Sequence, residues 1–213
     1  MKKRELQLIL DRETAGRNID TVRIAKEAIA GGARWIQLRD KMSDDGTLLR
    51  EALKLRELTT ETGAILIIND RVDIAMASGA DGVHIGQEDL PYECARRLLG
   101  ADKIIGISTH NIEQARAAQV KGADYIGVGP IFKTRTKPAL KAIGLDIIDM
   151  VSREIRIPAF FIGGIDLRNL DEVLNMGAGS IAVASAILQS NNITESTRSY
   201  VNKLREAEGM LTR

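Results

Sequence analysis

Cysteine and aromatic residues are scarce in this chain of 213 residues, and each shortage excludes a class of protein. The single cysteine, Cys94, excludes a disulfide framework and a cysteine-rich zinc site. It lies in an amphipathic stretch, Tyr92 to Leu99, where we expect a small and partly buried side chain. Aromatic residues make up 3% of the chain, and Trp35 and the few others offer no platform for stacked nucleic-acid bases.

An excess of one charge is also missing, as is any long hydrophobic run. Lys and Arg number 30 against 29 Asp and Glu, which argues against a basic nucleic-acid binder. The longest apolar run, Ile181 to Leu188, is interrupted by Ser185 and is far shorter than the ~20 residues of a membrane span. The apolar stretch after the basic start is too short for a signal peptide. We therefore expect a cytoplasmic protein with neither a membrane nor a nucleic acid as partner.

What the chain does contain is the composition of a folded protein, with 44% hydrophobic and 28% charged residues. At about 150 residues per domain, the length leaves one or two domains open. No linker, low-complexity segment or shift in composition divides the sequence. We expect a single domain spanning residues 1–213.

A Gly-Ala pair recurs six times, each time after a helix-like stretch and before a strand-like run. Glycine ends a helix at low cost because it has no Cβ to clash in the left-handed conformation. The pairs begin at Gly32, Gly63, Gly79, Gly100, Gly122 and Gly177. Two further apolar runs, Leu6 to Leu10 and Ile157 to Ile162, bring the predicted strands to eight.

Eight nearly continuous apolar strands that alternate with helices predict a closed (β/α)8 barrel, in a short form. Asn111 and Asp166 are expected to cap the helices that follow them. An open, doubly wound sheet is the alternative, but the first strand-helix turn, Asp11 to Asn18, lacks the glycine pattern typical of it. Barrels of this kind carry their chemistry at the carboxyl ends of the strands. The polar residues that follow each run should therefore meet on one rim.

Three groups of residues on this rim suggest anion binding, each with a plainer alternative. Gln37, Arg39 and Lys41 share one face of an extended segment and suit a phosphate or pyrophosphate, unless they are simply a charged loop edge. Gly163-Gly164 and Ala184-Ser185 follow the last two strands, where this fold often binds phosphate through backbone N–H groups, although a bare Gly-Gly is a weak motif. Thr134, Thr136 and Lys137 lie on the one long loop, which could close over a phosphate or could be an exposed polar loop.

Asp70 and Asp89 follow neighbouring predicted strands. Two carboxylates without nearby His or Cys ligands favour Mg²⁺, which also takes phosphate oxygens and water as ligands. The alternative is that each aspartate caps a helix. The two histidines, His84 and His110, lie on different elements, and we expect His84 to be a hydrogen-bonded residue that lines the barrel rather than a base.

Taken together, the motifs resemble the thiamine-phosphate synthase family, in order from about Leu8 to Leu188. The matching segments are QLRDK (37–41), INDRVD (68–73), ADGVHIGQED (80–89), GIS (106–108), GPIFKTRTK (129–137) and IGGI (162–165). The resemblance implies a transferase that joins a pyrimidine diphosphate to a thiazole phosphate and releases pyrophosphate.

The family's roles carry over where residues match, with Arg39, Ser108 and Lys137 implied as catalytic. The resemblance assigns the pyrimidine diphosphate to Gln37, Arg39, Lys41, Asn69, Ser108 and Lys137. It assigns Mg²⁺ to Asp70 and Asp89, and the thiazole phosphate to Thr134, Thr136, Gly164, Ala184 and Ser185. A thiazole tautomerase-like isomerase and a non-catalytic thiamine-phosphate-binding regulator are the alternative functions. The sequence leaves the oligomeric state open.

Overall fold

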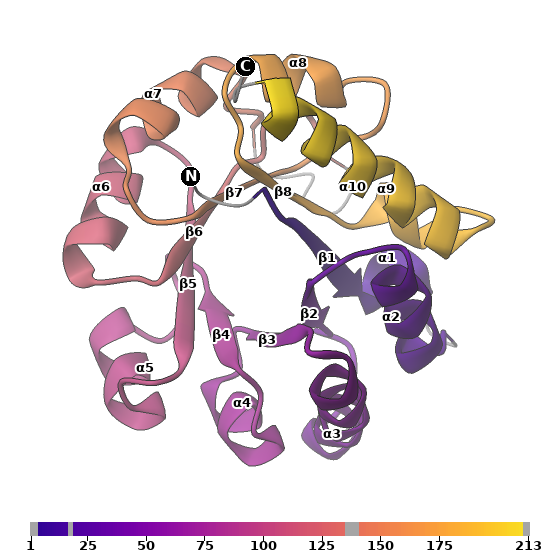
Figure 1. Cartoon of the computed structure of the whole chain (residues 1–213). Coiled ribbons are helices and arrows are strands. Elements are labelled where there is room, and N and C mark those ends of the chain that lie inside the picture. The colour runs from indigo at the N-terminus through magenta and orange to yellow at the C-terminus, as the bar shows by residue number, and fades with distance from the viewer. Residues whose placement is uncertain (1–3, 17–18, 135–140, 211–213) are drawn as a thin grey trace.

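The strands of this protein form a closed barrel with helices around it. The computed structural model describes residues 4–16, 19–134 and 141–210. All neighbouring strands pair in parallel and in chain order, and the last strand pairs with the first. In Figure 1 the strands lie at the centre and the helices surround them. The predicted (β/α)8 barrel is confirmed, and the open doubly wound sheet is wrong.

Each strand is followed by helix before the next strand begins. The strands are β1 (Leu6–Asp11), β2 (Trp35–Arg39), β3 (Ile65–Asn69), β4 (Gly82–Ile85), β5 (Ile104–Thr109), β6 (Tyr125–Val128), β7 (Ala159–Ile162) and β8 (Ser180–Val183). The helices are α1 (Arg12–Ala15), α2 (Thr21–Ala30), α3 (Asp45–Thr62), α4 (Val72–Ser78), α5 (Tyr92–Leu99), α6 (Ile112–Lys121), α7 (Asp146–Glu154), α8 (Leu170–Asn175), α9 (Ser185–Leu188) and α10 (Ile193–Met210). The last helix, α10, packs beside α2, α9 and β1.

The Gly-Ala pairs end helices as expected from the sequence. Gly63 and Gly79 follow α3 and α4 with φ of 67°, a left-handed conformation that costs a residue with a Cβ. The alanine after each of these glycines is buried beneath the helix. Ala101 differs, because it is exposed in the turn between α5 and β5. The Gly-Ala pair therefore marks the turn into a strand, but only the glycine of the pair is needed at every position.

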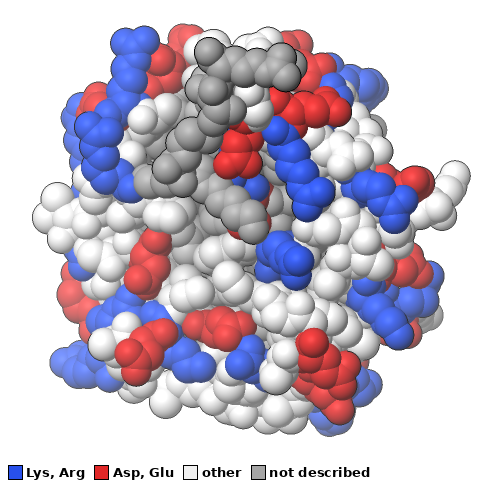
Figure 2. All heavy atoms as spheres, in the orientation of Figure 1, with Lys and Arg blue, Asp and Glu red and all other residues white. Residues whose placement is uncertain are grey.

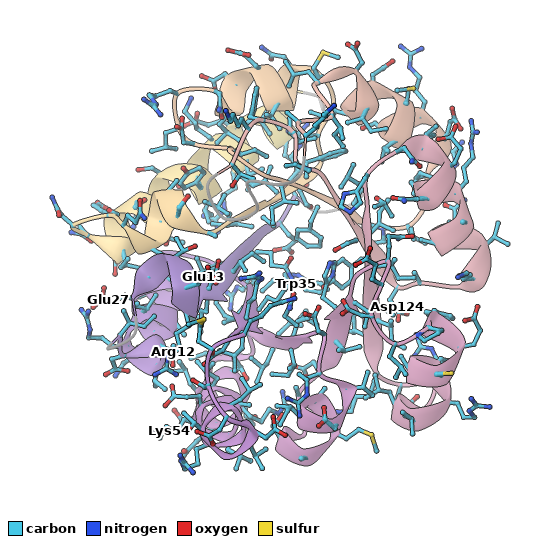
Figure 3. All side chains as sticks on the ribbon, turned by 180° about the vertical axis from the view of Figure 1, so that it is seen from behind. Arg12, Glu13, Glu27, Trp35, Lys54 and Asp124 are labelled. Atoms are coloured by element: carbon cyan, nitrogen blue, oxygen red, sulfur yellow. The ribbon has the colours of Figure 1, made fainter. Side chains whose placement is uncertain are left out.

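Alternate side chains of each strand divide between two regions. Side chains that point out, such as Leu8 and Ile36, join the helices in the main core. Side chains that point in form a smaller cluster around Tyr125 and Phe160, whose ring centroids lie 5.5 Å apart. Trp35 packs on both rings and lies within the ring of strands in Figure 3. These contacts make the interior of the barrel a packed core below the pocket. Full burial of one such side chain stabilises the fold by about 1.5–3 kcal/mol.

Replacing Gly106, on β5, by alanine is expected to lower the free energy of unfolding by about 1–3 kcal/mol, through overpacking of the barrel interior. An added Cβ would lie 2.1 Å from Tyr125 Cζ and 2.6 Å from His84 Nδ1. Denaturant unfolding measures the change. Gly179→Ala is the control, because there an added Cβ meets no described atom within 4 Å. Equal stability of the two variants would contradict the close packing around Gly106.

Two helix starts show where the sequence predictions hold and where they fail. Asn111 caps α6 as expected, with its side chain accepting a hydrogen bond from Gln114 N at 2.8 Å. Asp166 does not cap α8, which begins after Asn169. The Asp166 carboxylate instead accepts hydrogen bonds from the backbone and side chain of Arg168. These contacts hold a separate turn ahead of the helix, so the prediction of a cap at Asp166 was wrong.

The surface is mixed in charge on the face shown in Figure 2, where blue and red side chains are interspersed. Within the described ranges, no helix is both long and apolar enough to cross a membrane. The expectations of a cytoplasmic location and of no nucleic-acid partner stay predictions. So does the single domain over residues 1–213, since the terminal residues lie outside the described ranges.

Candidate active site

A pocket opens at the carboxyl ends of the strands. Eight of the residues predicted from the sequence line it: Gln37, Arg39, Asn69, Ser108, Thr134, Gly164, Ala184 and Ser185. Lys41 and Asp70 line an adjoining hollow that shares Asn69 with the pocket. Thr136 and Lys137, like Arg135 between Thr134 and Thr136, lie outside the described residues. The expected meeting of strand ends therefore brings residues from distant parts of the sequence to one place.

Arg39 is held in place by an aspartate that the sequence did not single out. Its Nη1 lies 2.8 Å from Oδ1 of Asp11, which is 1% exposed, and 4.0 Å from Oε2 of Glu13. Asp11 ends β1 in register with Arg39 on β2, so the two side chains point into the barrel side by side. Its other oxygen accepts a hydrogen bond from Thr14 Oγ1. The sequence did offer one signal for this role, because Asp11 is the charged residue that directly follows the first apolar run.

Asp70 and Asp89 face each other at the ends of β3 and β4. Burial raises the pKa of the Asp89 carboxyl above its ordinary value, and the neighbouring Asp70 carboxyl raises it further. Lys41 Nζ lies 2.8 Å from Asp70 Oδ2, and Asp89 Oδ2 accepts a hydrogen bond from Gly86 N at 2.7 Å. Neither aspartate is a helix cap, since α4 starts after Arg71 and α5 after Pro91. The backbone at Asp70 has a φ of 63°, which is uncommon for a residue other than glycine.

The paired carboxylates suit a hard divalent cation. Two acidic side chains that lie together, one of them kept from ionising freely, are stabilised when a cation lies between them. In the described part of the chain, no group of three or more His, Cys, Asp and Glu side chains forms a site for a metal. A set of two carboxylates is what Mg²⁺ uses when substrate phosphates and water complete its coordination, and it is too small for a structural zinc site.

The loops after β7 and β8 form the opposite wall of the pocket. Gly163 and Gly164 have φ values of 100° and 67°. A Cβ on Gly164 would lie 2.8 Å from both Lys133 O and Phe132 Cβ, so the loop after β6 packs directly on this glycine. Ala184 precedes the short helix α9, as expected from the sequence. At the two glycines this wall has backbone with no side chain over it, which suits a phosphate bound through backbone N–H groups.

The histidines occupy different surroundings. His84 is buried on β4, with Nδ1 3.0 Å from Tyr125 Oη and Nε2 2.9 Å from Ser108 Oγ. The prediction of a hydrogen-bonded residue that lines the barrel agrees with these contacts. His110, at the end of β5, places Nδ1 2.5 Å from Gly129 O. Both line the pocket.

Fold and site together define the class: a (β/α)8 barrel with a polar pocket at the carboxyl ends of its strands, where barrel enzymes carry out their chemistry. The sequence profile of one family, described as thiamine monophosphate synthase, matches residues 6–187. This chain belongs to that family. The predicted resemblance is therefore confirmed.

Individual relatives agree. The thiamine-phosphate synthase of Chloroflexus aurantiacus is 47% identical over 176 residues, which cover 82% of this chain and 81% of that protein. That of Thermosynechococcus vestitus is 45% identical over 185 residues, 87% of this chain but 53% of the relative. The chain thus spans about half the length of some relatives it matches. The structure of thiamine phosphate pyrophosphorylase from Pyrococcus furiosus superposes with a TM-score of 0.87 at 36% identity, covering 95% of this chain and 96% of the other.

Proposed function

We propose that the protein is a thiamine-phosphate synthase. It condenses 4-amino-2-methyl-5-(diphosphooxymethyl)pyrimidine with 4-methyl-5-(2-phosphooxyethyl)thiazole to give thiamine phosphate and pyrophosphate. The observation that carries the proposal is the rim itself, where Arg39 and Gly164 line the pocket and Asp70, which is paired with Asp89, lines the adjoining hollow. Membership of the family supports it across residues 6–187.

The diphosphate would lie on the side of β2 and β3. Its proposed contacts are Gln37, Arg39, Lys41, Asn69, Ser108 and Lys137. Arg39 Nε is buried without a hydrogen-bond partner in the described part of the chain, and a bound anion would supply one. The thiazole phosphate would lie on the opposite wall, against Thr134, Thr136, Gly164, Ala184 and Ser185, where backbone N–H groups can donate to it.

Asp70 and Asp89 would hold Mg²⁺ beside the diphosphate. When bound, the ion would neutralise part of the negative charge that the leaving pyrophosphate gains. Lys41 lies against Asp70 and adds positive charge at the same place. Asp89 is kept in position by its hydrogen bond from the backbone of Gly86.

Bond breaking would precede bond making. The bond between the pyrimidine methylene carbon and the diphosphate oxygen breaks, its electron pair leaves with pyrophosphate, and the electron-rich aminopyrimidine stabilises the cation. The thiazole nitrogen then forms the new C–N bond with its own lone pair, so no general base is needed. Arg39, Ser108 and Lys137 act on the leaving group by charge and hydrogen bonding, and the pocket places the two rings for attack.

The test is the identity of the product. Purified protein is incubated with both substrates and Mg²⁺, and the mixture is analysed by mass spectrometry. Thiamine phosphate should form with both substrates together and with neither alone. Conversion of a thiazole phosphate to an isomer without the pyrimidine would instead support the isomerase alternative. Binding of thiamine phosphate without any turnover would support the regulator.

Two neighbouring cations separate a specific role from general charge. Lys137→Ala is expected to lower kcat/KM by about tenfold or more relative to Arg135→Ala, because of these two cations only Lys137 is proposed to contact the diphosphate. Both changes remove one positive charge from the same loop, so the second is a matched control. Steady-state kinetics with each substrate varied in turn measures the difference. Equal losses in the two variants would contradict the assignment of Lys137.

A further inference from the structure

A chain of buried polar side chains runs across the inside of the barrel and ends at the pocket. Tyr125 Oη on β6 lies 3.0 Å from His84 Nδ1 on β4, and His84 Nε2 lies 2.9 Å from Ser108 Oγ on β5. Tyr125 is 1% exposed and His84 is 8% exposed, whereas Ser108 is half-buried and lines the pocket. The histidine therefore connects the barrel interior to a side chain proposed to contact substrate.

Glycines on the two neighbouring strands leave space inside the barrel for the His84 ring. In the register of the sheet, His84 lies opposite Gly106, Gly106 opposite Tyr125, and Ser108 opposite Gly127. A Cβ on Gly106 would lie 2.6 Å from His84 Nδ1, and one on Gly127 would lie 3.0 Å from His84 Cε1. Two glycines thus leave a slot that fits the imidazole, which fixes where its two nitrogens point.

The direction of the hydrogen bonds follows from what each group can donate. Burial raises the pKa of Tyr125, so its phenol keeps a proton to donate. A buried hydroxyl hydrogen needs an acceptor, because leaving it unpaired away from water costs free energy. In the described part of the chain, the hydrogen bond of the Tyr125 hydroxyl is the one with His84 Nδ1 at 3.0 Å, so Tyr125 donates to that nitrogen. A neutral imidazole that accepts at Nδ1 carries its proton on Nε2 and donates it to Ser108 Oγ.

We propose that His84 is a positioning residue, which donates from Nε2 to Ser108 Oγ and thereby directs the serine hydroxyl hydrogen into the pocket. In the opposite arrangement Ser108 would donate its hydrogen bond to Nε2. The serine oxygen would then face the diphosphate with a lone pair, and a lone pair repels an anion. The proposal rests on the proposed function for the identity of that anion. The position of the proton on His84 is a property of the free protein and can be tested without substrate.

The first measurement is therefore the tautomer of each histidine by ¹⁵N NMR of the uniformly labelled wild-type protein. The chain has two histidines, and His110 provides an internal standard. Its Nδ1 meets a carbonyl oxygen, which only accepts, so neutral His110 carries its proton on Nδ1. His84 should show the opposite tautomer, with the proton on Nε2. The His110→Gln spectrum assigns the signals, and a proton on Nδ1 of both rings would overturn the proposal.

The second measurement compares two amides at position 84. The glutamine side-chain nitrogen reaches about as far as histidine Nε2, whereas that of asparagine reaches about as far as Nδ1. His84→Asn should lower kcat/KM on the order of 10²-fold, the cost of losing one well-placed donor, and His84→Gln should restore much of that loss. The loss should fall mainly on kcat, because charge grows on the leaving group during bond breaking.

A double-mutant cycle with Ser108→Ala identifies the route of the effect. If His84 acts through Ser108, His84→Asn should change kcat/KM by less than about threefold once the hydroxyl is gone. A residue that merely supports the fold would cause the same loss in both backgrounds, and that result would overturn the proposal. Should wild-type protein fail to make thiamine phosphate, the proposed function fails while the NMR result still decides the orientation of His84.

Discussion

Replacement of Asp89 by asparagine is expected to lower the rate of thiamine-phosphate formation about 10³-fold while making the metal-free protein more stable. The first effect follows because Mg²⁺ supplies several kcal/mol of charge stabilisation to the leaving group. The second follows because Asp89 is partly buried against Asp70, and ionisation there is disfavoured. The asparagine keeps an oxygen to accept from Gly86 N, so the turn should survive.

The pH dependence of stability gives the sign of the second effect. Asp89 has a higher pKa folded than unfolded, so its ionised form costs stability above that pKa, and the cost disappears as the pH falls through it. In EDTA, the advantage of Asp89→Asn over wild type should therefore be largest near pH 7 and should shrink on acidification. Added Mg²⁺ should raise the melting temperature of wild type alone.

Glu88→Gln is the matched control, because it removes one negative charge from the adjacent, exposed residue. It should leave activity, Mg²⁺ response and stability close to wild type. Asp89→Asn protein that retained wild-type turnover, or that was destabilised in EDTA like an ordinary lost ion pair, would contradict the metal assignment.

Arg39→Lys is expected to lower kcat/KM about 10²-fold with little loss of stability, because lysine keeps the charge but not the fork of donors. Arg39 Nη1 already contacts Asp11 at 2.8 Å. A lysine ammonium can satisfy the buried Asp11 carboxylate and preserve the fold, but it cannot also reach the diphosphate in the same way. Steady-state kinetics and denaturant unfolding measure the two quantities separately.

The control is Arg12→Lys, the same exchange in the neighbouring ion pair with Asp40. Arg12 belongs to α1, outside the pocket lining, and its replacement should leave kcat/KM near wild type. An Arg39→Lys enzyme within about twofold of wild type would show that a point charge suffices, and bidentate binding would be excluded.

Local signals in the sequence were enough to predict the barrel. Glycines such as Gly63 and Gly79 mark helix ends through backbone conformation, which depends on nearby residues. Once eight strands were counted, the rule that strand ends share one rim brought Arg39, Asn69 and Ser108 together.

Features that depend on contacts across strands could not be predicted in this way. The pairing of Asp11 with Arg39 needs the register of β1 against β2, which no local pattern gives. The slot around His84 likewise needs three strands in register, so Gly106 and Gly127 carried no meaning in isolation. The prediction of a cap at Asp166 failed because its carboxylate binds Arg168 and its backbone N–H donates to Asn169 Oδ1, so these residues form a separate turn and α8 begins only after Asn169.

The most direct test of the central claim is a single reaction in which both products are counted. Wild-type protein with the two substrates and Mg²⁺ should release one pyrophosphate for each thiamine phosphate formed, and excess EDTA should stop both together. Pyrophosphate released without thiamine phosphate would make the protein a hydrolase of the pyrimidine diphosphate. Full turnover in EDTA would contradict the role of Asp70 and Asp89, and formation of neither product would contradict the proposed function itself.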